Sequence, residues 1–100
     1  MEIRNRTELY KRAIEKWGER AQMEMAQEEA TELATAIRKQ YRKNTDETFK
    51  NLVDEVADVE IMIEQIEFMH DHLYFRDHVE NRKKFKLNRL QERLDNNSFE

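Results

Sequence analysis

Residues 26–69 read AQEEATELATAIRKQYRKNTDETFKNLVDEVADVEIMIEQIEFM, and this stretch decides the fold. Apolar side chains recur in it at spacings of three and four, on both sides of a polar segment at residues 42–46. Such spacing predicts two amphipathic helices, which we place at residues 19–41 and 47–69. A connection this short makes consecutive helices antiparallel neighbours, so the stretch predicts a helix hairpin. The apolar positions are Ala26, Ala30, Leu33, Ile37 and Tyr41, then Leu52, Val56, Val59, Met62, Ile63, Ile66 and Met69.

Two further helices are expected to flank the hairpin. The first is placed at residues 7–17, with Thr7 as its N-cap and Gly18 as the break that follows. The second is placed at residues 76–94, before a tail at residues 95–100 that is expected to fray. Its inward side chains are Val79, Leu87, Leu90 and Leu94. We therefore predict an all-α fold, in which the antiparallel hairpin and its flanking helices form a four-helix-bundle-type core completed by oligomerisation.

Length and composition narrow the class of protein. With 100 residues the chain is expected to be a single domain, residues 1–100, and a core this small favours pairing with a second copy. The net charge of −4 argues against binding a nucleic acid polymer, which needs a basic surface. Without cysteine there is no disulfide framework and no thiolate chemistry. A polar N-terminus and the lack of an apolar run of about 20 residues predict a cytoplasmic protein without a membrane partner.

Four carboxylates lie on the apolar sides of the two hairpin helices. Glu29 and Glu32 are three residues apart, as are Glu55 and Asp58, and residues three apart share a helix face. The two pairs lie at equal distances from the predicted turn, so an antiparallel hairpin brings them opposite each other. The alternative is that they are solvated, or paired with lysine and arginine.

Mutual repulsion makes such a cluster costly. Two carboxylates about 5 Å apart repel by roughly 3 kcal/mol at an effective dielectric of about 20, and six such pairs would exceed a small domain's stability of about 5–15 kcal/mol. Protonation, basic partners or a bound cation would relieve the repulsion. Because the donors are hard oxygens, with no histidine or cysteine among them, they favour Mg²⁺, or alternatively Mn²⁺, over zinc.

At these residues the sequence resembles the MazG-like all-α nucleoside triphosphate pyrophosphohydrolases, a group that includes the dimeric dUTPases. The pattern is an acidic EExxE on one helix and ExxD on the next, here Glu28-Glu29-Ala30-Thr31-Glu32 and Glu55-Val56-Ala57-Asp58. The surroundings, from Ala13-Ile14-Glu15-Lys16-Trp17-Gly18 to Gln22, are also similar. The resemblance covers residues 9–69 and, more loosely, the last helix.

The resemblance implies Mg²⁺-dependent cleavage of a (d)NTP to a (d)NMP and pyrophosphate, for cleaning the nucleotide pool, by a homodimer or homotetramer. It implies that Glu29, Glu32, Glu55 and Asp58 hold the metal. Glu28 would then be an outer ligand or the general base that orients the attacking water, or else a solvated residue. The rival hypothesis is a helical interaction or nucleotide-binding module without catalysis.

A triphosphate also needs positive charge and a place for its base. We expect Lys83, Lys86 and Arg89 to contact the phosphates, although a charge run is more often a solvated face. Trp17 would stack on the base or, the interpretation we favour, pack in the core. Gln22 or Asn51 would hydrogen-bond the base edge. His70 and His72 are assigned no ligand role, and Met23, Met25, Met62 and Met69 are expected to fill the core.

Overall fold

The computed structural model describes residues 5–96, and all of its regular structure is helical. The helices are α1 (Arg6–Trp17), α2 (Glu19–Arg42), α3 (Asp46–Met69) and α4 (Phe75–Asp95), with a short 3-10 helix η1 (Asp71–Leu73) before α4. The chain divides into two compact units, residues 1–69 and residues 70–100. The all-α class and the four predicted helices are confirmed, whereas the single domain and the four-helix-bundle core stay predictions.

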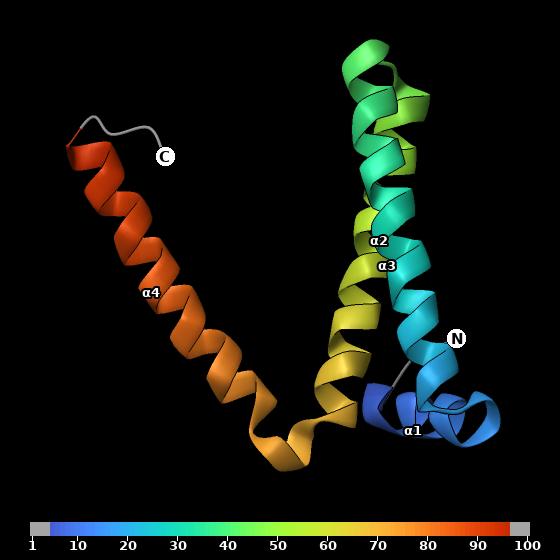
Figure 1. Ribbon diagram of the computed structural model, residues 1–100. Helices are drawn as coiled ribbons and strands as arrows, with labels where there is room; N and C mark the ends of the chain where they lie inside the picture. Colours follow the sequence, from blue (N-terminus) through green and yellow to red (C-terminus); the bar gives the residue numbers. More distant parts are fainter. Residues whose placement is uncertain (1–4, 97–100) are drawn as a thin grey trace. The chain divides into compact units, whose positions relative to one another are not determined.

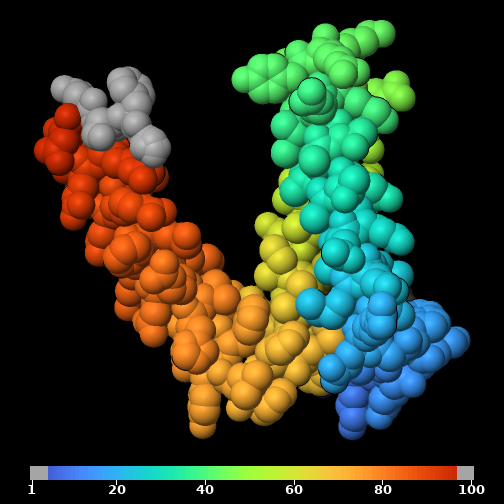
Figure 2. Space-filling view, viewed as in Figure 1, coloured from blue at the N-terminus to red at the C-terminus, as the bar shows by residue number. Residues whose placement is uncertain are grey.

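The first unit is built on the antiparallel hairpin of α2 and α3, which is confirmed (Figure 1). Figure 2 shows the atoms of α2 lying directly against those of α3. At the turn Thr45 and Thr48 cap each other: the backbone N–H of each donates to the side-chain hydroxyl of the other, at 2.9 and 3.2 Å. This reciprocal arrangement is a capping box with threonine at its second position, and it begins α3 at Asp46.

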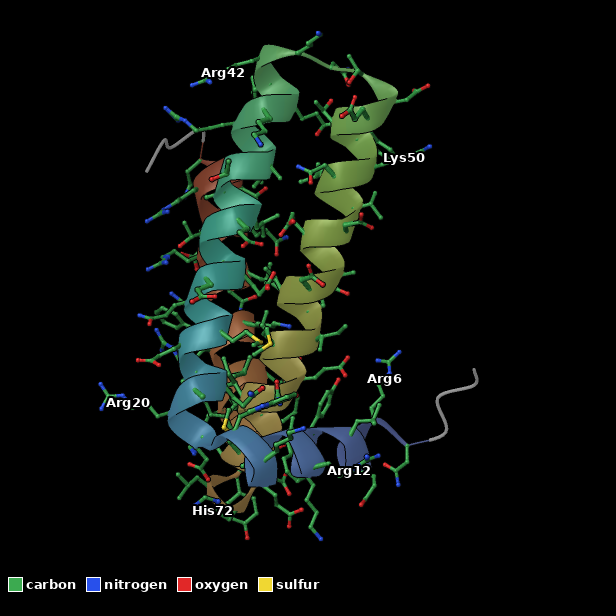
Figure 3. The ribbon with its side chains drawn as sticks, turned by 90° about the vertical axis from the view of Figure 1, so that its right-hand side faces the viewer. Arg6, Arg12, Arg20, Arg42, Lys50 and His72 are labelled. Atoms are coloured by element: carbon green, nitrogen blue, oxygen red, sulfur yellow. The ribbon has the colours of Figure 1, made fainter. Side chains whose placement is uncertain are left out.

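The helix α1 packs at the open end of the hairpin, against both α2 and α3. In Figure 3 it crosses in front of them, far from Arg42 and Lys50 near the turn. The prediction that Thr7 is its N-cap is wrong. Asn5 takes that position, and its side chain accepts a hydrogen bond from the Glu8 backbone N–H at 3.1 Å. Asparagine is at least as favourable an N-cap as threonine, so the helix begins one residue earlier than predicted.

Gly18 ends α1 and starts α2 with φ 90° and ψ 155°. This backbone conformation is almost restricted to glycine because a side chain would clash with its own backbone. The Gly18 N–H donates to the Ile14 carbonyl at 2.7 Å, which satisfies one of the open carbonyls at the end of α1. Gly18 therefore lets the chain change direction between two helices with no intervening loop.

The core of the first unit is small. Its buried apolar residues among those described are Ala36, Met62 and Met69, with Gln22 and Gln65 also buried. The expectation that all four methionines fill the core is therefore wrong for Met23 and Met25, which are exposed. The physical reason is that α2 has only α1 and α3 beside it in this unit, so part of its surface has no neighbour to cover it.

The second unit consists of η1 and α4. Tyr74 joins them in the left-handed conformation, at φ 55°. No residue of α4 is buried, so the expectation of an inward face at Val79, Leu87, Leu90 and Leu94 is wrong within this unit. One helix and one 3-10 turn offer no second helix to cover that face. The helix ends at Asp95, while residues 97–100 of the predicted tail lie outside the described residues.

No helix in the part of the chain that the structure describes combines the length and hydropathy needed to span a bilayer.

Candidate metal centre

The hairpin brings together the carboxylates that the sequence placed at one level. Glu29 and Glu32 come from α2 and Glu55 from α3, and each offers one carboxylate oxygen within 4.8 Å of the others. Asp58 lies close enough for its charge to raise the pKa of both Glu29 and Glu55. The four residues therefore form one acidic cluster across the hairpin.

Two members of the acidic cluster are partly withdrawn from solvent. Glu29 and Glu55 are half-buried, whereas Glu32 and Asp58 are exposed. The Oε2 atoms of Glu29 and Glu55 are shielded from water and accept no hydrogen bond from any described residue. A shielded carboxylate oxygen without a donor is unfavourable. These two oxygens thus need a hydrogen-bond donor or a cation that residues 5–96 do not supply.

Burial and mutual repulsion also change the pKa values of two carboxyl groups in the cluster. The pKa of Glu29 is raised above its ordinary value of 4.5, first by burial and then by the charges of Glu32, Asp58 and Glu55. The pKa of Glu55 is raised by burial and then by the charges of Glu32 and Asp58. Both groups therefore hold a proton to higher pH than an isolated glutamate does.

The described residues offer the four carboxylates no ion pair. Among residues 5–96, no salt bridge joins a lysine or arginine to any of the four carboxylates. Protonation or a bound cation would relieve the repulsion. Hard oxygen donors suit Mg²⁺ or Mn²⁺, and the two orphaned Oε2 atoms are where a cation would be coordinated. The acidic cluster fits a divalent cation.

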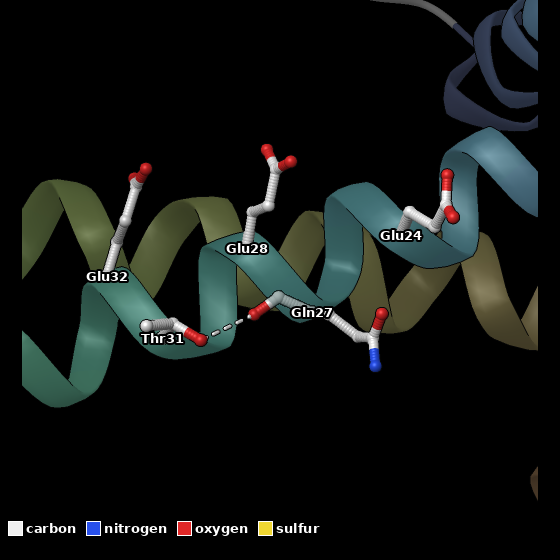
Figure 4. Close-up of a pocket in the computed structure, with 5 residues that line it drawn as sticks. All are labelled: Glu24, Gln27, Glu28, Thr31 and Glu32. Carbon is white, nitrogen blue, oxygen red and sulfur yellow. Dashed lines mark hydrogen bonds between the residues drawn. The ribbon is translucent and has the colours of Figure 1, made fainter.

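Glu28 lies beside the acidic cluster on the outer side of α2. It lines an open hollow of about 610 Å³ with Glu24, Gln27, Thr31 and Glu32. In Figure 4 Glu24, Glu28 and Glu32 project from the same side of the helix, and Thr31 donates to the Gln27 carbonyl at 3.0 Å. Glu28 is exposed, unlike the half-buried Glu29 and Glu55 of the cluster. Its role as ligand or base stays a prediction.

The three residues assigned to the base differ in their surroundings. Trp17 is 58% exposed, and the Lys16 ammonium lies 5.5 Å from its ring centroid. The interpretation that Trp17 packs in the core is therefore wrong, because more than half of this residue is exposed. Gln22, in contrast, is buried. Asn51 lines a separate hollow near the hairpin turn. Contacts of all three with a base stay predictions.

The three cations assigned to the phosphates belong to α4, in the second unit. All are exposed. Lys83 lies 3.5 Å from the Glu80 carboxylate, and the Arg89 guanidinium lies 5.8 Å from the Phe85 ring centroid. Lys86 belongs to the same charged stretch. These contacts are local to α4, so phosphate binding by Lys83, Lys86 and Arg89 stays a prediction.

Sequence reasoning missed a second polar site, where α1 meets α3. The Tyr10 hydroxyl donates to Glu64 Oε1 at 2.5 Å, and Arg6 pairs with Glu64 Oε2 at 2.9 Å. Burial and the Glu64 carboxylate raise the pKa of Tyr10 to about 12, and the Tyr10 hydrogen bond lowers the pKa of Glu64. No local spacing connects these residues, since α2 separates them in the chain. The site anchors α1 to the hairpin.

Comparisons with protein-family models, with curated proteins and with solved structures found no match to this chain.

Proposed function

We propose that this protein is a Mg²⁺-dependent nucleoside triphosphate pyrophosphohydrolase that converts a (d)NTP to a (d)NMP and pyrophosphate. The observation that carries the proposal is the convergence of Glu29, Glu32 and Glu55, which each offer one carboxylate oxygen within 4.8 Å of the others. The Oε2 atoms of Glu29 and Glu55 are also shielded and unpartnered among the described residues. The resemblance of the two acidic motifs supports the choice of substrate and reaction.

In this proposal Glu29, Glu32, Glu55 and Asp58 bind the cation. A bound Mg²⁺ would neutralise phosphate charge and acidify a water molecule. The half-buried Glu29 and Glu55 orient their oxygens through burial in the hairpin, while Glu32 and Asp58 face solvent on the side open to a substrate. Glu28, one residue from Glu29, would accept a proton from an attacking water.

The positive charge for a triphosphate would come from Lys83, Lys86 and Arg89. In α4 the segment from residue 82 to residue 89 carries five basic side chains and no acidic one. Arginine grips phosphate oxygens with two parallel hydrogen bonds, whereas lysine acts as a point charge. The exposed ring of Trp17 offers a stacking surface for a base.

The test is a panel of canonical and oxidised dNTPs, assayed with Mg²⁺ for release of pyrophosphate rather than phosphate. We expect pyrophosphate from at least one nucleotide. The variants Glu29→Gln and Asp58→Asn should lose most of this activity. When residues act as a unit, removing one of them lowers kcat by orders of magnitude. The matched control is Glu60→Gln, an exposed residue of α3 outside the acidic cluster. Equal activity in all three variants would contradict the site assignment.

A second candidate function is a helical interaction or nucleotide-binding module without turnover. The observation that favours it is the number of large apolar side chains exposed on the hairpin, among them Phe49, Val53 and Ile63. Binding of a nonhydrolysable nucleotide with Mg²⁺, but no turnover of any member of the panel, would favour nucleotide binding alone. The absence of both nucleotide binding and turnover would favour the interaction module.

A further inference from the structure

The charged side chains of α4 are sorted by sign onto different sides of the helix. At about 100° per residue, all of its basic residues except Lys84 fall within one sector of roughly 160°, namely Arg76, Arg82, Lys83, Lys86, Arg89 and Arg93. The same sector contains the apolar residues Phe75, Val79, Leu87, Leu90 and Leu94. We call these residues together the basic–apolar face. The acidic residues of α4 all lie outside it, and they are Asp77, Glu80, Glu92 and Asp95.

Within the basic–apolar face, the cations and the aliphatic side chains occupy two adjacent strips. Four cations lie between about −40° and 20° around the helix from Phe75, and four aliphatic residues lie between about 40° and 120°. Lys83 lies among the aliphatic residues, at about 80°, where the stem of a lysine can cover apolar surface while its ammonium group extends outward. The helix therefore presents an apolar strip bordered by positive charge.

The apolar strip is not covered by any described part of the chain. No residue of α4 is buried, and Leu87, Leu90 and Leu94 are 62%, 49% and 67% exposed. Single apolar residues scattered over a surface are ordinary, whereas neighbouring ones that together form a patch mark an interaction site. The row of leucines therefore indicates a partner with an apolar region of its own.

Part of the positive charge also lacks a local counter-charge. Glu80, at the border of the basic–apolar face, pairs with Arg76 at 2.8 Å and with Lys83 at 3.5 Å. Within residues 5–96, no salt bridge to Arg82 or Lys86 is found. These cations remain available to an anionic partner.

Positive charge beside aliphatic surface favours an anionic lipid bilayer over a nucleic acid. The phosphates of a nucleic acid would attract the cations but would leave the leucines in water. At a bilayer surface, an amphipathic helix inserts its apolar strip at the boundary of the acyl chains, while its cations meet anionic headgroups. The acidic side of α4 would then face water. We propose that α4 binds the surface of bilayers that contain anionic phospholipids, through its basic–apolar face.

This binding needs no membrane-spanning segment. The sequence-based expectation of no membrane partner rests on the lack of such a segment, whereas a helix of about 30 Å, such as α4, can lie in the plane of the surface. The proposal does not rest on the proposed hydrolase activity. Lys86 and Arg89 would serve either a triphosphate or a lipid headgroup, but the leucines serve only the bilayer.

The test is sedimentation of the full chain with vesicles of phosphatidylcholine alone, or of equimolar phosphatidylcholine and phosphatidylserine. We expect binding only to the vesicles that contain phosphatidylserine. Binding should weaken as the salt concentration rises, because salt screens the attraction between the cations and the headgroups. Equal binding to both kinds of vesicle, or binding to neither, would overturn the proposal.

Matched substitutions on the two sides of α4 then assign the face. Lys86→Gln should lower the partition coefficient about fivefold, while Lys84→Gln, on the acidic side, should change it little. Leu90→Ala should lower it about tenfold, while Phe85→Ala, outside the face, should change it little. Leu90 and Phe85 are matched in exposure, at 49% and 52%. Equal effects within both pairs would overturn the assignment.

Circular dichroism checks that each variant keeps its helices, which we expect because no residue of α4 is buried. Arg82→Gln and Leu94→Ala repeat the comparison at a second cation and a second leucine, and they replace any variant that loses helicity. A nucleic acid partner would give a different pattern. Binding to single-stranded RNA that Lys86→Gln weakens and Leu90→Ala leaves unchanged, without binding to vesicles, would overturn the proposal in favour of nucleic acid.

Discussion

Glu29 on α2 and Glu55 on α3 each carry one carboxylate oxygen, Oε2, that is shielded from water and accepts no hydrogen bond from residues 5–96. Burial and the neighbouring carboxylates raise the pKa of both groups. A proton and a divalent cation would compete for the oxygens of these two residues. The acidic cluster is therefore expected to respond both to metal and to pH.

Divalent cations should stabilise the protein. A ligand that binds only the folded state adds about 2.7 kcal/mol when its concentration is 100-fold above Kd, so millimolar Mg²⁺ or Mn²⁺ should raise the melting temperature, and Na⁺ at equal ionic strength should not. Glu29→Gln should abolish most of the rise. Glu60→Gln, which removes a carboxylate outside the cluster, should keep it. An unchanged rise in Glu29→Gln would place the cation elsewhere.

The metal-free protein should become less stable as the pH rises above 4.5. The pKa values of Glu29 and Glu55 are raised in the folded state relative to 4.5. The folded state therefore binds more protons than the unfolded state in this range, and stability falls with pH. Melting followed from pH 5 to pH 8 in chelator should show this decline, and saturating Mg²⁺ should flatten it. A stability that rises steadily over this range without metal would contradict the prediction.

The contribution of Glu64 to stability has the opposite dependence on pH. The effects of Glu64 and of the acidic cluster can therefore be measured separately. Its pKa is lowered by the Tyr10 hydrogen bond and by Arg6, so its stabilising effect is present above 4.5 and is lost as pH falls below that value. Glu64→Gln should reduce the loss of stability on strong acidification. It should leave the decline between pH 5 and pH 8 unchanged.

Tyr10→Phe should loosen α1 from the hairpin. Removing the hydroxyl deletes the hydrogen bond to Glu64, which is expected to cost about 1 kcal/mol in the free energy of unfolding measured with urea. The salt bridge between Glu64 and Arg6 persists in this variant. Tyr41→Phe is the control, because Tyr41 is 92% exposed and should change stability little. Spectroscopic titration of the wild type should also show one tyrosine ionising near pH 12.

Gly18→Ala should destabilise the protein through backbone strain alone. A Cβ at Gly18 would meet no atom within 4 Å, so there is no clash with neighbours. The strain at φ 90° and ψ 155° should cost about 1–3 kcal/mol in the free energy of unfolding. Lys43→Ala, at φ −148°, is the control and should be near neutral. An equal loss in both variants would contradict a conformational origin.

The sequence by itself determined the helices, the hairpin and the meeting of Glu29, Glu32, Glu55 and Asp58. These follow from local periodicity and from a turn at the midpoint between the two acidic pairs, and neither depends on distant neighbours.

Only the tertiary structure decided which side chains are covered. It shielded Glu29 and Glu55 while leaving Glu32 and Trp17 exposed, and it joined Tyr10 to Glu64. A helical repeat identifies a face, but its burial depends on whether another helix lies against it. That depends on packing between segments distant in the chain, which no local pattern records.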